Sequence, residues 1–172
     1  DGSDGSGANS SFLKNTPVEI NETEVPIKIL HYGLEPDSGG AGKHRGGMAT
    51  TLRFVAQTPN TRVTARNRDR TRFTSWGMLG GRAGSNSRFV LNAGTENQVD
   101  LGNVDILEMG PGDDLWISCG GAGGWGDPFD RDPDAVALDV SRGLVSLESA
   151  GADYGVVLID GAVNYDATKV KR

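Results

Sequence analysis

Apolar and polar residues alternate along much of the chain, most clearly in two adjacent segments. Residues 50–57 and 61–68 place an apolar residue at about every second position, and the turn-forming sequence TPN at 58–60 separates them. A period of two puts alternate side chains on opposite faces of a strand, so the pair predicts a β-hairpin. The predicted inward-facing residues are Leu52, Phe54 or Val55, Val63 and Ala65.

Other short apolar runs lie between turn-forming residues. Residues 18–34 alternate irregularly around Pro26, which predicts two short strands or a bent edge strand, because proline cannot donate a hydrogen bond to a sheet. Further strands are predicted at 89–91, 103–109 and 114–119. Most of residues 15–119 is therefore expected to be antiparallel β-structure.

The pattern changes to a helical period after residue 132. Asp132 is a favoured N-cap residue and Pro133 suits the first helical position, so a helix is predicted from residue 133 to about 141. Gly143 stands where glycine commonly ends a helix. A second short helix is predicted over 146–153.

The tail, residues 154–165, holds an apolar run that Asp160 and Gly161 interrupt. An Asp-Gly pair between apolar residues is typical of a tight turn, so we expect a final strand that turns back on itself. The predicted fold class is α+β, mainly antiparallel β with two short C-terminal helices.

The composition indicates a domain rich in turns. The chain has 172 residues, enough for one domain, with 26 glycines, 6% aromatic and 36% hydrophobic residues. Such a chain is expected to bury part of its surface against neighbouring chains. Residues 1–14 are polar and of low complexity, which predicts a flexible N-terminal segment before a domain at 15–172.

Charge and cysteine content narrow the function classes. The net charge of −6 argues against general nucleic-acid binding, which requires an excess of Lys and Arg. The single cysteine, Cys119, cannot form an internal disulfide, and structural zinc sites need several ligands, so a reducing cytoplasm is the simplest location. No apolar run reaches the 18 or so residues of a membrane span.

A basic cluster recurs at alternating positions. Its members are Arg62, Arg66, Arg68, Arg70 and Arg72. A period of two places all five on one face of a strand or strand-turn segment. We favour a salt-bridged face toward an acidic neighbour or another subunit over a nucleic-acid surface, because the chain as a whole is acidic.

The glycine-rich sequence GGAGGWGDPFDRDP at 120–133 is the most informative motif. Glycine is favoured where φ is positive or where another backbone or a ligand comes close. Trp125 and Asp127 project from this loop, although Asp127 could instead form an Asx-turn before Pro128. The candidate substrate-binding or interface residues here are Gly120, Gly121, Gly123, Gly124, Trp125, Gly126 and Asp127.

A second glycine-rich stretch, SGGAGKHRGG at 38–47, resembles a phosphate-binding loop only superficially. A P-loop requires Gly at the position of Asp37 and Ser or Thr at the position of His44. Lys43, His44 and Arg45 remain candidates for contact with an anion, a substrate carboxylate or another subunit. The alternative is a shaped turn with solvated charges.

Few residues offer catalytic chemistry. His31 lies in an alternating segment, where a hydrogen-bonded structural role is more common than a role as general base. Cys119 could be a nucleophile only beside a base, and we favour a small buried residue at a strand end. The acidic residues Asp113, Asp114, Asp127, Asp130 and Asp132 could bind a hard cation, but turn and cap roles explain most of them.

Ordered sequence blocks over nearly the whole chain resemble the hydantoinase B family. The blocks are NTPVE at 15–19, EPDSGGAGKHRGG at 35–47, DRTRFTSWGMLGG at 69–81, GPGDDLWISCGG at 110–121 and the run at 120–158. They are similar to the C-terminal portion of the family's subunits, which are several hundred residues long. The loop departs from the family's more usual GGGGYGDP at Ala122, which tolerates positive φ poorly, and at Trp125 in place of Tyr.

The resemblance implies a role in an ATP-dependent complex that hydrolyses a cyclic amide such as a hydantoin, an oxoproline or a lactam. It implies as partners the remainder of the B subunit and an ATP-binding A subunit. ATP and a divalent metal are implied for the whole complex; the metal ligands belong to the earlier part of the subunit, so this chain alone is expected to bind neither. The alternatives are part of an ATP-dependent ketone carboxylase and a non-catalytic assembly domain.

Overall fold

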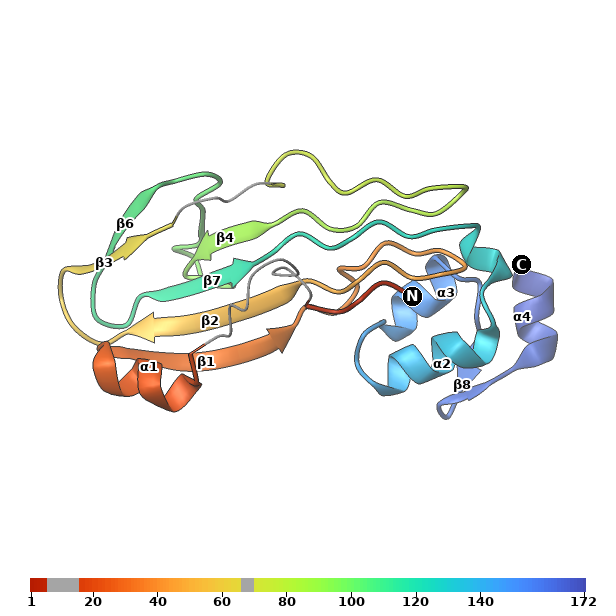
Figure 1. Cartoon of the computed structure of the whole chain (residues 1–172). Coiled ribbons are helices and arrows are strands. Elements are labelled where there is room, and N and C mark those ends of the chain that lie inside the picture. Colours follow the sequence, from red (N-terminus) through yellow and green to blue (C-terminus); the bar gives the residue numbers. More distant parts are fainter. Residues whose placement is uncertain (6–15, 66–69) are drawn as a thin grey trace.

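The computed structural model describes residues 1–5, 16–65 and 70–172. The molecule is elongated, with the main β-sheet at one end, helices α2, α3 and α4 at the other, and long extended segments running between them (Figure 1). This arrangement places the glycine-rich segments in the middle of the molecule.

The main sheet contains five strands, β1 (Ile27–Leu34), β2 (Thr50–Ala56), β7 (Asp114–Ser118), β4 (Arg88–Leu91) and β5 (Val99–Asp100), in that spatial order. Every neighbouring pair is antiparallel. The register between β1 and β2 shifts between Ile29 and His31. The predicted antiparallel β-structure is confirmed.

A second, two-stranded sheet covers one face of the first. It pairs β3 (Thr61–Thr64) with β6 (Ile106–Met109). Met109 of β6 is buried in the same core as Phe54 and Phe89 of the main sheet, and Val63 packs against that core. Of the inward-facing alternatives at 54 and 55, it is therefore Phe54 that is buried in the core.

The helical end has a separate core. It is built from α2 (Pro133–Ser141), α3 (Leu147–Ala152), α4 (Tyr165–Lys171) and the hairpin of β8 (Leu158–Ile159) with β9 (Ala162–Val163); the short 3-10 helix η1 (Pro128–Asp130) leads into it. The buried members of this core are Ala41, Val136, Val145, Ala150, Tyr154 and Val156. Ala41 comes from a glycine-rich segment, so this core attaches the middle of the molecule to the helices.

The predicted local signals of this end are confirmed. Asp132 caps α2, its Oδ1 accepting a hydrogen bond of 3.0 Å from the amide of Asp134, and Gly143 after the helix has φ of 70°. Ser146 caps α3 in the same way. Asp160 and Gly161, with φ of 50° and 80°, form the turn of the β8–β9 hairpin.

The hairpin predicted between residues 50–57 and 61–68 is wrong. β2 pairs with β1 and β7, whereas β3 pairs with β6 in the other sheet. The turn after β2 therefore carries the chain from one sheet to the other. Residues 66–69 of the second segment lie outside the described residues.

Two helices were missed. Residues 18–34 form α1 (Val18–Glu24) and then β1, not two strands; Pro17 precedes the helix, and Pro26 restricts Val25 to an extended conformation that ends it. α4 is the second, capped by Asn164, whose Oδ1 accepts from the amide of Ala167. The structure thus has more helices than the two predicted at the C-terminal end.

Candidate functional site

Four extended segments run side by side in the middle of the molecule: residues 1–5, 38–48, 75–85 and 120–126. The amides of Gly121 and Gly124 donate to Ser85 and Arg82, and the amides of Ala122 and Trp125 donate to Gly47 and His44. The amides of Gly2 and Gly5 donate in the same way to Arg45 and Met48. The two donors of each pair are three residues apart in the sequence. A repeat of three is that of a polyproline-II-type helix and not that of a β-strand. We call these four segments the glycine bundle.

Close backbone approach explains the glycines of the loop. A Cβ atom on Gly121 would overlap the carbonyl oxygen of Ser38, and one on Gly123 would overlap the carbonyl oxygen of Trp76. Ala122 between them is exposed, with its own amide and carbonyl bonded to Gly47 and Gly40. Its φ is negative, so the expected difficulty of placing alanine here does not arise. Among residues 120–126, only Gly126 has a positive φ.

Three side chains form a row across the surface of the bundle. Trp125 forms a bridge pair with His44 on one side and with Met78 on the other. The rings of His44 and Trp125 lie 5.4 Å apart at an angle of 44°. Trp125 and Met78 are 46% and 64% exposed, and Leu79 beside Met78 is also exposed. The bundle therefore presents His44, Trp125 and Met78 to solvent on a fixed backbone.

The side chain of Asp127 is not part of this row, because it forms a local hydrogen bond. Its Oδ1 accepts a hydrogen bond of 2.9 Å from the amide of Phe129 and so caps η1. The structure therefore confirms the Asx-turn alternative for Asp127. Lys43 is exposed beside the row, and its amide donates to the carbonyl of Gly126.

Arg45 differs from its neighbours Lys43 and His44 because it is buried, so the alternative of a turn with solvated charges is wrong for this residue. Arg45 is only 3% exposed, and its Nε lies 3.4 Å from Oδ2 of Asp139 in α2. Arg131, 4% exposed, donates from Nη2 to the same oxygen at 2.7 Å. The glycine bundle is thus joined to the helical end by two buried guanidinium groups that share one buried carboxylate.

The first residues of the chain complete this charged cluster. Asp1 accepts hydrogen bonds from Nη1 and Nη2 of Arg131 at 2.6 and 2.8 Å, and Asp4 accepts from Nη1 of Arg45 at 2.9 Å. Burial would raise the pKa of Asp4, but hydrogen bonds from Arg45 and the Met48 amide, with the charge of Arg45, hold the pKa below its ordinary value. The expected flexibility and domain boundary near residue 14 stay predictions, because residues 6–15 lie outside the described part.

Tyr154 lies close to these charges and is 2% exposed. Burial raises its pKa to about 12; the positive charge of Arg131 opposes the rise and the negative charge of Asp139 adds to it. The phenol therefore stays neutral at every pH at which the protein is expected to work.

The other candidate residues do not join the site. His31 is exposed on β1. Cys119 is exposed, contrary to the expectation of a buried thiol, and the Thr50 hydroxyl lies 3.4 Å from its Sγ.

The predicted arginine face is not a single strand face. β3 ends at Thr64, and Arg70 has φ of 60°, so the alternation stops before the cluster does. Arg62 forms an exposed salt bridge with Glu108 of β6 at 2.7 Å, and Arg72 lies over the ring of Phe73. Arg66 and Arg68 lie outside the described residues.

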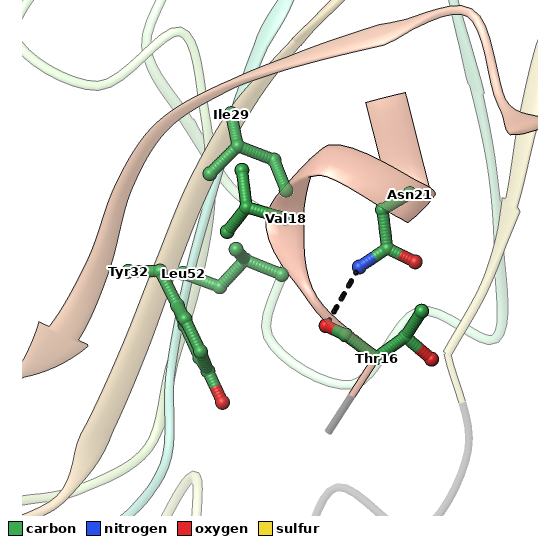
Figure 2. Close-up of a pocket in the computed structure, with 6 residues that line it drawn as sticks. All are labelled: Thr16, Val18, Asn21, Ile29, Tyr32 and Leu52. Atoms are coloured by element: carbon green, nitrogen blue, oxygen red, sulfur yellow. Dashed lines mark hydrogen bonds between the residues drawn. The ribbon is translucent and has the colours of Figure 1, made fainter. Parts of the chain in front are cut away.

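A shallow groove of about 140 Å³ lies between α1 and the main sheet (Figure 2). Its lining residues are Thr16, Val18, Asn21, Ile29, Tyr32 and Leu52. Figure 2 shows Asn21 turned toward Thr16, to whose carbonyl its amide donates at 3.3 Å, while aliphatic side chains form the other wall. The groove is far in sequence from the glycine loop, and two of its lining residues, Thr16 and Val18, belong to the block at 15–19 that carried the family resemblance.

Residues 1–5, 16–65 and 70–172 contain no group of three or more His, Cys, Asp and Glu side chains placed to hold a metal ion. No helix in these ranges has the length and apolar character needed to cross a membrane.

Comparison with known proteins shows the family to which this chain belongs. A sequence model described as Hydantoinase B/oxoprolinase matches residues 1–128, which include all four segments of the glycine bundle. The chain therefore belongs to the hydantoinase B/oxoprolinase family, as its sequence blocks predicted.

Individual relatives share most of this chain. An uncharacterized protein of Methanocaldococcus jannaschii is 37% identical over 92% of the chain, and the caprolactamase subunit beta of Pseudomonas jessenii is 34% identical over 87%. A nucleotide-free structure of acetone carboxylase matches 91% of the chain with a TM-score of 0.71 and 25% identity. The chain spans only 26% to 28% of the length of these proteins.

Proposed function

We propose that this chain provides the glycine-rich scaffold of a hydantoinase B type subunit, within an ATP-dependent complex that hydrolyses a cyclic amide. A hydantoin, an oxoproline or a lactam is the expected substrate class, and one relative is named as a caprolactamase subunit. The partners are the remainder of the B subunit and an ATP-binding A subunit. The single cysteine supports a location in the reducing cytoplasm.

The observation that carries the proposal is the row of His44, Trp125 and Met78. It lies within the part of the chain that the family model matches, and its backbone is fixed by hydrogen bonds between three segments. Exposed tryptophan and methionine on a rigid backbone are typical of surfaces that bind a ligand or another protein. We assign this row, with Lys43 beside it, to contact with the substrate or with the rest of the complex.

ATP and the metal are assigned to other parts of the complex. His44 stands where a P-loop needs a hydroxyl for magnesium, and the described residues do not fit a complete metal site. A metal used by the complex is therefore proposed to be held outside this chain. Its contribution is to position neighbouring elements and to exclude water from the surface it covers.

A second candidate is a ketone carboxylase, and the acetone carboxylase structure favours it. That structure matches 91% of this chain, and the structure of an ATP-dependent caprolactamase from Pseudomonas jessenii matches 90%, so the fold is shared with relatives of both kinds. The two functions differ in their second substrate, since a carboxylase must consume carbon dioxide or bicarbonate and a hydrolase consumes water.

The deciding experiment uses the intact complex that contains this chain. It is incubated with ATP and with caprolactam, hydantoin or 5-oxoproline in bicarbonate-free buffer, and the ring-opened acid is measured. Hydrolysis without bicarbonate is expected. Turnover that requires bicarbonate and a ketone would instead establish the carboxylase.

Variants then separate a role in turnover from a role in assembly alone. Trp125→Ala is compared with Leu147→Ala, which removes a similarly exposed apolar side chain from α3. We expect Trp125→Ala to lower turnover per assembled complex at least tenfold, with Leu147→Ala unchanged. If Trp125→Ala changes only the fraction of assembled complex, the chain is an assembly domain.

A further inference from the structure

Two buried arginines, Arg45 and Arg131, form ion pairs with Asp139 and with two carboxylates of the segment 1–5. Arg45 and Arg131 are both more than nine-tenths buried, and Asp139 between them is 5% exposed. Asp139 can neutralise only one of the two guanidinium groups. The second positive charge is met by Asp1 and Asp4, whose side chains are about one-third exposed. Buried guanidinium groups need such anionic partners, because removal from water is costly for an unpaired charge.

Both ion pairs and backbone hydrogen bonds hold residues 1–5 in place. Residues 1–5 contain no helix or strand, and two of the five are glycines. Besides the carboxylates, the amides of Gly2 and Gly5 donate to the carbonyls of Arg45 and Met48. Nε of Arg131 is buried and has no hydrogen-bond partner among the described residues, so the arginine pair retains one unused donor.

We propose that Arg45 and Arg131, arranged around Asp139, form a carboxylate receptor for an acidic segment of the pattern Asp-x-x-Asp, which Asp1–Gly5 fills here. The spacing fits because residues three apart in an extended threefold segment face the same side. This inference is independent of the reaction that the complex catalyses.

Docking of the segment also fixes the candidate site. Oδ1 of Asp1 accepts from the amide of Arg45 at 2.8 Å, and Nη1 of Arg131 donates to the carbonyl of Lys43 at 3.1 Å. These two contacts hold the backbone on both sides of His44, whose ring lies against Trp125. Asp1 and Arg131 are thus positioning residues for the His44–Trp125 contact, and Asp4 holds the same segment from the Arg45 side chain and the Met48 amide.

The first test uses the full chain with Asp1→Ala and Asp4→Ala combined, against a control with Asp105→Ala and Asp166→Ala, which removes two exposed carboxylates elsewhere. Hydrogen exchange is measured at the amides of Arg45 and Met48, which donate to Asp1 and Asp4. The Trp125 indole resonance, identified with Trp125→Phe, reports the candidate site.

We expect exchange at Arg45 and Met48 to be at least tenfold faster in the Asp1/Asp4 variant and the Trp125 resonance to shift, with neither change in the control. Protected amides and an unshifted resonance in the folded Asp1/Asp4 variant would overturn the proposal.

The second test supplies the segment separately. A chain that begins at Ser6 is titrated with the blocked peptide DGSDG and with the matched peptide NGSNG. Saturable binding of the acidic peptide, with renewed protection of the Arg45 amide, is expected. Equal binding of both peptides, or binding of neither to the folded shortened chain, would contradict a carboxylate receptor. If the shortened chain does not fold, the full-chain variant decides.

Discussion

Arg131 donates a hydrogen bond of 2.7 Å from Nη2 to Oδ2 of Asp139, and both residues are almost completely buried. Arg131 follows the glycine loop, and Asp139 lies within α2, so the pair fixes the loop to the helix that the loop leads into. Because Arg45 approaches the same oxygen, one carboxylate holds two separate glycine-rich segments in place.

Asp139→Asn should strongly destabilise the chain. It leaves two buried guanidinium groups without their shared charge, and breaking a buried ion pair typically costs about 3–5 kcal/mol. Urea denaturation gives the free energy of unfolding. Glu108→Gln is the control, because it breaks the exposed pair with Arg62 and should cost less than about 1 kcal/mol. Equal effects of the two variants would show that Asp139 has no special role.

Gly121→Ala should destabilise the chain much more than a change at the next residue. The new methyl group would overlap the carbonyl of Ser38, and overpacking of this kind costs about 1–3 kcal/mol or more. Ala122→Ser, at an exposed position of the same loop, should stay within about 0.5 kcal/mol of the wild type. Thermal unfolding of both variants measures the difference. A fully stable Gly121→Ala protein would contradict the tight contact between the segments.

Tyr154 should make the fold sensitive to alkali. Its pKa rises from 10.0 in the unfolded chain to about 12 in the fold because it is buried. The folded state therefore keeps a proton that the unfolded state releases, so the free energy of unfolding falls as the pH rises from 10 to about 12. Tyr154→Phe should reduce this fall, whereas Tyr32→Phe, at an exposed position, should not. Urea midpoints across this range test the prediction, and identical slopes for wild type and Tyr154→Phe would refute it.

Cys119 should react with a thiol reagent in the folded protein. It is the single cysteine and is exposed, so one thiol per chain should be labelled by DTNB without denaturant. The number of thiols labelled in urea, where the chain is unfolded, provides the control. Labelling only after unfolding would show that the thiol is covered.

Local signals in the sequence predicted the helical end well. The Asp132-Pro133 pair and Ser146 located α2 and α3 because a capping residue acts on amides two or three positions away. The same reasoning could have found α4, since Asn164 precedes it, Asp166 lies in its first turn, and Lys169 and Lys171 lie in its last.

Contacts between distant residues could not be predicted in this way. The alternation in residues 50–57 and 61–68 identified both strands, but not that they belong to different sheets, because alternation carries no information about the pairing partner. The burial of Arg45 depends on Asp139, which lies 94 residues later, and on Asp4 in a segment that reads as polar and featureless.

The candidate site was partly predictable. The glycine loop and Trp125 stood out in the sequence because so many glycines in order require a close backbone approach. The partners of the loop were not evident, since hydrogen bonds at every third residue between four separate segments leave no periodic pattern of side chains. The blocks of the family resemblance covered most of the second, third and fourth segments, but not residues 1–5.

We propose that this chain works inside an ATP-dependent complex of the hydantoinase B type. Native mass spectrometry of the purified complex, with intact masses of every chain measured under denaturing conditions, tests it most directly. We predict that the chain is found together with the remaining part of a B subunit and an ATP-binding subunit, and that this assembly opens a cyclic amide when ATP is added. A stable lone monomer, with no assembled form and no turnover, would show that the chain does not work in such a complex.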